Sequence, residues 1–436
     1  MLGQIHPLKG NRMIPNQDAA SAAQPDILVI GAGVVGICSA YYLAGRGQRV
    51  TVVDKGEVGA GCSYGNAGLL VPSHSVPLAA PGVFRKALKW IGNPESPLYI
   101  KPRLSLSLLS WMWRFQMACR ENPMRKAIPV LRDLSLASLA LHQELAGKSG
   151  MDWCYAEKGL LMVYRSSHGL KDGGHEASLL AEYGIKSRIL GAQEVRELAP
   201  EVRPEIVGGV FYPDDAHLQP HQFVQSVARL AKDKGVEIRT GTEVLGFENA
   251  GGKIRTVRTT RGDFHPGQVV LATGSWSPGL TRDFNLDVCI QPAKGYSVTV
   301  RRPARWSSPP LMLCEAKVGV TPMGDTLRFA GTLELAGLDF SINSRRVSAI
   351  QRAAREYLVG AGEAELIEIW RGLRPCTPDA LPIIARSKSP ENLIVAAGHG
   401  MLGVSLGPIT GKLVSQIATL ETPMIDLSLH SAERFQ

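Results

Sequence analysis

The stretch from Asp26 to Asp54 constrains this chain more than any other, because it places a strand, a glycine loop, a helix and a second strand in order. Ile27 to Ile30 is a short apolar run that predicts a buried strand. The glycines that follow fit the pattern G-x-G-x-x-G, at Gly31, Gly33 and Gly36. The first glycine of this pattern permits a tight turn, the second lets a pyrophosphate approach the backbone, and the third lets the next helix pack on the strand.

The rest of this unit indicates which nucleotide it binds. A helix is predicted over about Val34 to Gly45, and its free N–H groups and positive dipole end favour phosphates. Val50 to Val53 predicts the second strand, and Asp54 ends it about 20 residues after the glycines. A carboxylate there accepts hydrogen bonds from the hydroxyls of an adenosine ribose and disfavours a 2′-phosphate, so NADP is not expected.

Size and charge exclude several classes of protein. A chain of 436 residues is long enough for two or three domains, and it has no apolar run long enough to span a bilayer. The formal charge of +9 suits an anionic substrate or an acidic membrane surface, whereas scattered basic residues without interleaved aromatics predict no nucleic-acid partner. The seven cysteines form no C-x-x-C pair, which predicts reduced thiols in a cytoplasmic protein and no metal site.

The pattern along the chain predicts two interleaved parts. Residues 1–25 have the composition of a flexible extension. Small residues from Gly59 to Leu70 would let the backbone lie against a flat ring, with a surface loop as the alternative. The α/β pattern returns after residue 205, and Val269–Gly274 again places glycine after a strand, so the nucleotide-binding part is expected to be discontinuous. Residues 288–335 predict an antiparallel sheet.

Residues 81–132 are rich in cations and contain three tryptophans, Trp90, Trp111 and Trp113. This composition suggests an amphipathic segment that rests on a membrane surface. The preferred interpretation is nevertheless a helix whose apolar side joins the core and whose charges are solvated.

The C-terminal fifth contains two further motifs. A strand predicted over Ile367 to Arg371 leads into the run from Gly372 to Asp379. Another strand, Asn392 to Ala397, is followed by glycines that are expected to open a helix at Gly398–Gly403. The amides of such a helix would stabilise negative charge on a reduced ring.

Taken together, these motifs resemble the D-amino-acid dehydrogenase branch of the D-amino-acid oxidase/glycine oxidase superfamily of FAD enzymes. The resemblance rests on six segments in order: Gly31–Gly36, Asn66–Gly68, Ala80–Gly82, Pro292–Ser297, Gly372–Asp379 and Gly398–Gly403. It implies an α/β fold, α+β in part, in which a Rossmann-like FAD-binding domain is interleaved with an antiparallel-sheet substrate domain. The implied FAD-binding domain comprises residues 26–85, 205–285 and 385–436, and the substrate domain comprises residues 86–204 and 286–384.

The resemblance also implies roles for individual residues. Arg374 corresponds to the arginine that binds the substrate carboxylate, with a structural ion pair to Asp379 as the alternative, and Tyr296 lies on the strand that lines the substrate cavity. Arg371 is expected to face solvent. The implied cofactor-binding residues are Gly31, Gly33, Gly36, Asp54, Ser63, Asn66, Ala67, Gly68, Val244, Thr273, Gly274, Gly398, His399, Gly400, Leu402 and Gly403. Gly372 stands where the covalent sarcosine oxidases have cysteine, so FAD is expected to be non-covalent.

The implied activity is oxidative deamination of a small D-amino acid, including cyclic ones such as D-proline or hydroxy-D-proline. A hydride would pass from Cα to flavin N5, and the electrons would go to a quinone or an electron-transfer partner. An oxygen-using oxidase of the glycine/sarcosine oxidase type is the main alternative; an NAD-linked dehydrogenase and a non-catalytic nucleotide-binding protein are the others. The expected location is the cytoplasm, with peripheral contact to the inner face of the membrane through residues 81–132.

Overall fold

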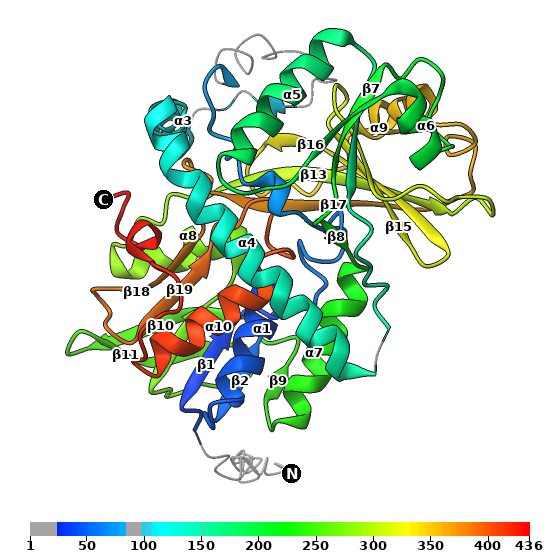
Figure 1. The fold of residues 1–436 in the computed structure, drawn as a ribbon. Helices are drawn as coiled ribbons and strands as arrows, with labels where there is room; N and C mark the ends of the chain where they lie inside the picture. The colour runs from blue at the N-terminus through cyan, green and yellow to red at the C-terminus, as the bar shows by residue number, and fades with distance from the viewer. Residues whose placement is uncertain (1–23, 84–97, 102, 104, 151) are drawn as a thin grey trace, which may run out of the picture.

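The computed structural model describes residues 24–83, 98–101, 103, 105–150 and 152–436, which form two large sheets (Figure 1). The first sheet has six strands, all parallel except the edge strand β18. Across the sheet they are β18 (Ile383–Arg386), β19 (Leu393–Ala397), β12 (Gln268–Leu271), β1 (Ile27–Ile30), β2 (Val50–Val53) and β9 (Glu237–Arg239). β1 and β2 are fully buried, as expected for apolar strands covered on both faces.

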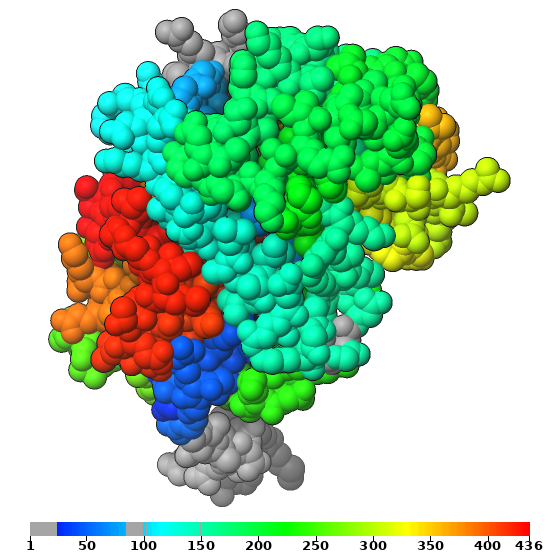
Figure 2. Space-filling view, viewed as in Figure 1, coloured from blue at the N-terminus to red at the C-terminus, as the bar shows by residue number. Residues whose placement is uncertain are grey.

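Helices cover one face of this sheet. They are α1 (Val34–Ala44), α7 (Pro220–Asp233), α10 (Gly407–Ala418) and the long α4 (Glu121–Ser149), which runs along the front of both sheets in Figure 1. Figure 2 shows the C-terminal segment lying beside α4 and the N-terminal part of the chain. The opposite face packs against α3 (Leu106–Ala118) and the hairpin of β10 (Val244–Ala250) and β11 (Lys253–Thr259).

The second sheet is mostly antiparallel and has nine strands. In order they are β17 (Leu366–Cys376), β13 (Gln291–Arg301), β16 (Thr326–Leu335), β15 (Val318–Met323), β14 (Leu311–Leu313), β5 (Leu160–Tyr164), β7 (Gly208–Tyr212) and β6 (Arg188–Gly191), with β4 (Leu98–Ile100) paired to β16. α9 (Ser344–Tyr357) and α6 (Ala192–Leu198) share a core with this sheet. The remaining elements are β3 (Leu69–Leu70) paired with β8 (Ala216–His217), α5 (Ser167–Ala181), α8 (Ser277–Thr281) and the short 3₁₀ turns Pro72–His74, Gly274–Trp276, Arg282–Phe284 and Ser428–His430.

Most of the expected strands and helices are present, but the sheet to which β7 belongs and the presence of α5 differ from expectation. β7 pairs with β5 and β6 in the second sheet, although it lies in the segment 205–285 that was expected to join the cofactor part. The domain boundaries therefore stay a prediction. α5 carries no sequence signal for a helix, because it contains three glycines; a side chain at Gly173 would lie 2.1 Å from the hydroxyl of Tyr164, so close packing explains that glycine.

The described part of the basic segment 81–132 has features of both interpretations, a helix packed on the core and an apolar face open to a membrane surface. Trp111 is buried and its Nε1–H donates to the carbonyl of Cys376 (2.9 Å), whereas Trp113 is 62% exposed. Trp90 lies outside the described residues. Within the described part of the chain, no helix is both long and apolar enough to cross a bilayer.

Candidate active site

A cavity of about 550 Å³ lies at the carboxyl ends of the parallel strands, where β1, β12 and β19 each lead into a glycine-containing loop. The edge strand β17 of the second sheet closes it from the other side. The expected cofactor residues that line it are Gly31, Gly33, Asp54, Ser63, Asn66, Val244, Thr273, Gly274, His399, Gly400 and Gly403. Segments far apart in the sequence therefore meet at one site.

The three glycines of the first loop have the separate roles that their pattern predicts. Gly31 has φ of +109°, and a Cβ there would lie 2.6 Å from the carbonyl oxygen of Ala272. A Cβ at Gly36 would lie 1.8 Å from the carbonyl of Gly31, so this glycine does not line the cavity but lets α1 pack against the loop. At Gly33 a Cβ would meet no protein atom closer than 3.5 Å, so bare backbone faces the cavity there.

Asp54 is held rigidly at the end of β2. Its Oδ2 accepts a hydrogen bond from the N–H of Ala32 (2.7 Å) and its Oδ1 accepts one from Gly56 (2.8 Å). Each oxygen retains a lone pair for a ribose hydroxyl. Thr242 and Val244 line the cavity with it, where an adenosine would lie.

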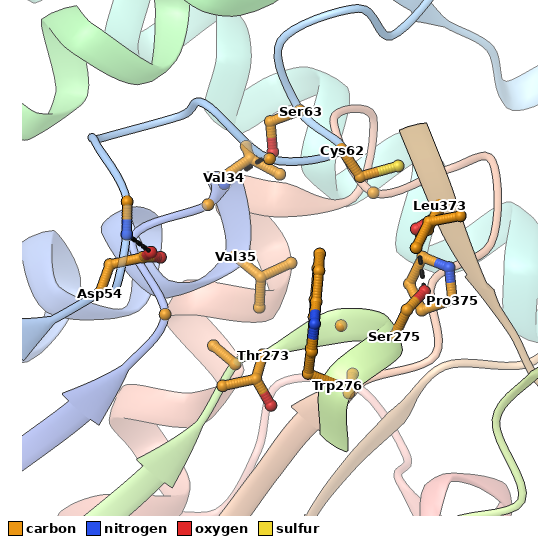
Figure 3. Close-up of a pocket in the computed structure, with 18 of the residues that line it drawn as sticks. Val34, Val35, Asp54, Cys62, Ser63, Thr273, Ser275, Trp276, Leu373 and Pro375 are labelled. Atoms are coloured by element: carbon orange, nitrogen blue, oxygen red, sulfur yellow. Dashed lines mark hydrogen bonds between the residues drawn. The ribbon is translucent and has the colours of Figure 1, made fainter. Parts of the chain in front are cut away.

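The loop from Ser63 to Gly68 forms another wall. Figure 3 shows Ser63 bonded to Val34 at this wall, where its hydroxyl accepts from the first N–H of α1 (3.0 Å), and Ser275 bonded to Leu373 at the opposite wall. Asn66 accepts a bond from Gly68 (2.8 Å) and donates to the carbonyl of Met401 (3.3 Å).

Two expected members of this loop do not line the cavity. Ala67 packs in a neighbouring core cluster, and a side chain at Gly68 would meet the carbonyl of Leu218 at 2.1 Å. The buried Arg328 fixes the loop by donating from Nη1 to the carbonyls of Tyr64 (2.9 Å) and Asn66 (3.1 Å).

The helix expected to open at Gly398–Gly403 is present as α10, but it begins later, at Gly407, so its predicted start was wrong. Isolated turns precede it, in which the N–H of Leu406 donates to the carbonyl of Leu402 (2.8 Å). Gly398 and Leu402 do not line the cavity. His399 does; its Nε2 bonds the hydroxyl of Thr410 (2.9 Å), and burial lowers the pKa of His399 to about 3, so the ring is neutral.

Arg374 projects from β17 beside the cavity, which its neighbours Gly372, Leu373 and Pro375 line although Arg374 itself does not. Its Nη1 donates to the carbonyl of Thr332 (2.8 Å), and no acidic side chain of the described residues pairs with it. Its other guanidinium nitrogens are neither bonded nor sealed from solvent. The alternative ion pair with Asp379 is wrong, because that carboxylate pairs with Arg434 at 2.8 Å.

Tyr296 lies elsewhere. It is buried on the side of the sheet that packs with α9, and it does not line the cavity. Its hydroxyl donates to Glu334 (3.1 Å) and accepts from the N–H of Asn343 (3.2 Å). Both contacts favour a structural role for this tyrosine.

Sequence reasoning missed an aromatic cluster in the cavity wall. Arg371 was expected to face solvent but lines the cavity; its Nε donates to the carbonyl of Phe340 (2.9 Å), and its guanidinium lies 4.8 Å from the Phe340 ring. Trp276 stacks on Phe340 with ring centres 6.1 Å apart. Only the place of Trp276, directly after Thr273–Gly274, could have signalled this cluster from the sequence.

These residues fit a dinucleotide. The cavity offers bare backbone at Gly33 beside a helix N-terminus for a pyrophosphate, and the fixed carboxylate of Asp54 for a ribose. The remaining volume extends to β17, where a second ring system would meet Trp370 and Leu373.

Known proteins of similar sequence and structure agree with this reading of the cavity. A family model described as FAD dependent oxidoreductase matches residues 26–417. A D-amino acid dehydrogenase from Chromohalobacter salexigens is 35% identical over 411 residues, which cover 92% of this chain and 97% of the relative. The protein of the same name from Methylobacterium nodulans is 34% identical over 407 residues, covering 92% and 96%.

Solved structures show the same fold. Glycine oxidase from Bacillus cereus superposes with a TM-score of 0.74 at 25% identity, covering 92% of this chain and 96% of that one. Glycine oxidase from Geobacillus kaustophilus gives 0.77 at 24% identity, covering 94% and 98%. With the glycine-lined cavity and the family match in agreement, the chain is an enzyme with FAD as its cofactor, and it belongs to the DAO family of FAD-dependent oxidoreductases.

Proposed function

We propose that this enzyme catalyses the oxidative deamination of a D-amino acid, as the names of its relatives suggest. The observation that carries the proposal is the guanidinium of Arg374, which among the described residues has one backbone partner and no acidic partner, and whose other nitrogens are open beside the cavity. A carboxylate binds such a group with two parallel, charge-assisted hydrogen bonds. Small acyclic D-amino acids and cyclic ones such as D-proline or hydroxy-D-proline all present that carboxylate.

In this proposal the residues of the chain bind and orient the substrate, and the cofactor supplies the redox chemistry. The chemistry that bound FAD would supply is acceptance of a hydride from the substrate Cα. Arg374 holds the carboxylate and so fixes the Cα–H in one place. The imino acid product is released to water, where an acyclic one hydrolyses to a keto acid and ammonia and a cyclic one remains a ring imine. The expected cofactor residues that line the cavity would bind FAD without a covalent link. Tyr296 is not proposed as a catalytic residue.

Arg374→Lys tests this assignment. Lysine keeps the charge but cannot bind a carboxylate in two-pronged fashion. Losing such contacts to a charged group costs about 3–5 kcal/mol, which is roughly 10²- to 5 × 10³-fold in rate. We expect a loss of that size in kcat/KM for the best D-amino acid, with an unchanged flavin spectrum.

Arg301→Lys is the matched control. Arg301 ends β13 in the same sheet, is exposed, and pairs with Asp325 and Glu365 at the surface. Its replacement is expected to leave turnover unchanged. Near-normal activity of Arg374→Lys would remove Arg374 from its proposed role.

We further propose that the electrons leave to a quinone at a membrane surface, with the protein in the cytoplasm and in contact with the inner face of the membrane. Three apolar side chains on one face of α3 support this proposal: Leu106, Leu109 and Trp113 are 86%, 58% and 62% exposed. The loop that contains Phe340 lies near the start of α3, because Lys101 pairs with Asp339 at 3.2 Å.

Phe340 links this surface to the cofactor cavity, since it is 44% exposed and also lines the cavity. The rival acceptor is oxygen. Hydrogen peroxide formed in equal amount to the substrate consumed would identify an oxidase, whereas reduction of an added soluble quinone without peroxide supports the proposal.

A further inference from the structure

The strand β16 carries an extra residue opposite the substrate-side end of β13. Lys294 pairs with Glu334 and Tyr296 pairs with Gly331, so two steps along β13 correspond to three steps along β16. This is the geometry of a β-bulge, a feature that re-aims groups near active sites. Thr332 lies within the bulge and has φ of +61°. A β-branched residue in this left-handed region is a backbone outlier, and such strain persists where the surrounding structure requires it.

The strained conformation directs a backbone carbonyl at Arg374. The oxygen of Thr332 accepts the hydrogen bond from Nη1 (2.8 Å), the one hydrogen bond that the described residues make to this guanidinium. The side chain of Thr332 does not explain this conformation, because its buried hydroxyl has no hydrogen-bond partner in the part of the chain that the structure describes. The bond to Arg374 is therefore the contact that the unusual backbone makes available.

Gly295, on the facing strand, provides the surface on which the guanidinium lies. A Cβ at this position would lie 1.8 Å from Nη1, 2.2 Å from Cζ and 2.5 Å from Nη2 of Arg374. Three guanidinium atoms thus cover the face of Gly295, and no larger residue leaves room for them there. The Arg374 guanidinium, fixed on one face and at one nitrogen, has little rotational freedom, while its remaining N–H donors are available to a ligand.

We propose that Gly295 and Thr332 are positioning residues for the substrate carboxylate: Gly295 supplies the platform and Thr332 the carbonyl that together orient the Arg374 guanidinium. This inference rests on the proposed function of Arg374. It predicts that the backbone conformation at position 332 matters, rather than the threonine side chain, and that any Cβ at position 295 displaces the guanidinium.

The test uses purified FAD-loaded protein and two readouts. The first is the dissociation constant of propionate, a carboxylate without an amine, followed by the change in the flavin spectrum. The second is anaerobic flavin reduction by the D-amino acid that reacts fastest. Gly295→Ala is expected to weaken propionate binding, and to raise the substrate concentration that gives half-maximal rate of flavin reduction, each by about 10- to 100-fold, as for losing a charge-assisted hydrogen bond. Thr332→Pro is expected to change both by a similar factor, because proline fixes φ near about −65° and so moves the carbonyl at position 332 away from Nη1.

Gly319→Ala is the control for a methyl group added to the same sheet, since a Cβ there meets no atom closer than 3.5 Å. Wild-type propionate binding by Gly295→Ala or by Thr332→Pro overturns the inference. If either variant fails to load FAD, a crystal structure of the wild type with propionate decides: the inference requires Nη1 on the Thr332 carbonyl and the carboxylate on the remaining nitrogens. A wild-type flavin that no amino acid reduces would instead defeat the proposed function, whatever the propionate result.

Discussion

At the scale of single residues, burial sets the protonation of Asp215. Its carboxylate accepts hydrogen bonds from the N–H (3.1 Å) and the hydroxyl of Ser73. Burial raises the pKa of Asp215 to about 7, and the bonds from Ser73 oppose this shift. Between the ordinary value of 3.8 and about 7 the folded protein binds more protons than the unfolded chain, so this residue's contribution to stability falls as pH rises through that window.

Asp215→Asn removes this titration. We expect the melting temperature of the variant, relative to wild type, to rise steadily from about pH 5 to about pH 8. Thermal unfolding over that range, followed by circular dichroism, measures the difference. Parallel curves for the two proteins would show that Asp215 does not titrate with a raised pKa.

At the scale of elements, the contact between α1 and its glycine loop is the most demanding in the cofactor half. A methyl group at Gly36 would lie 1.8 Å from the carbonyl of Gly31 and push the helix off the loop. Gly36→Ala is therefore expected to lose FAD and to be destabilised by about 1–3 kcal/mol or more. Flavin content per chain and melting temperature measure both effects.

Gly147→Ala gives the matched comparison, because it also lies in a helix but a Cβ there meets nothing within 4 Å. It is expected to stabilise the protein by up to about 1 kcal/mol, since alanine favours the helix. Full FAD binding by Gly36→Ala would contradict the role assigned to the third glycine.

The exposed face of α3 carries the membrane proposal. Replacing Leu106, Leu109 and Trp113 with serine is expected to weaken co-sedimentation with anionic vesicles at least about tenfold, because each large apolar side chain contributes roughly 1.5–3 kcal/mol when buried. Flavin reduction by the substrate should not change. The control replaces three exposed apolar residues elsewhere, Ile189, Val359 and Leu420. Equal loss in both triple variants would exclude a specific membrane face.

At the scale of the whole molecule, burial of histidine predicts acid sensitivity. Burial lowers the pKa of His74, His142 and His217 to about 4 and that of His399 to about 3. The unfolded chain then binds more protons between about pH 4 and 6.5, so stability is expected to fall as pH decreases through this window. Guanidinium chloride midpoints measured at about pH 7 and pH 5 test this; a higher midpoint at pH 5 would contradict it.

The sequence predicted the cofactor half well, because local patterns encode it. Each strand-glycine unit is contiguous, and the glycines at 31 and 36 meet steric needs that no other residue satisfies. The strand order of the second sheet was harder to predict from the sequence, because pairs such as β4 with β16 and β5 with β14 join distant segments.

The same limit explains the errors at the site. Arg371 and Phe340 meet through tertiary packing between β17 and the loop after β16, which no local pattern records. Tyr296 was assigned to the substrate side from its motif alone, whereas strand alternation sends it to the face that packs with α9. Arg374 could be proposed from the sequence because its motif is contiguous, whereas the bulge at Thr332 could not be predicted because it depends on the register of two strands.

Anaerobic mixing of the purified, FAD-loaded protein with D- and L-enantiomers of alanine and proline tests the central claim most directly. The account predicts a yellow protein whose flavin absorption is bleached by at least one D-enantiomer and by neither L-enantiomer. A colourless protein that takes up no FAD, or a bound flavin bleached only by L-amino acids, would contradict it.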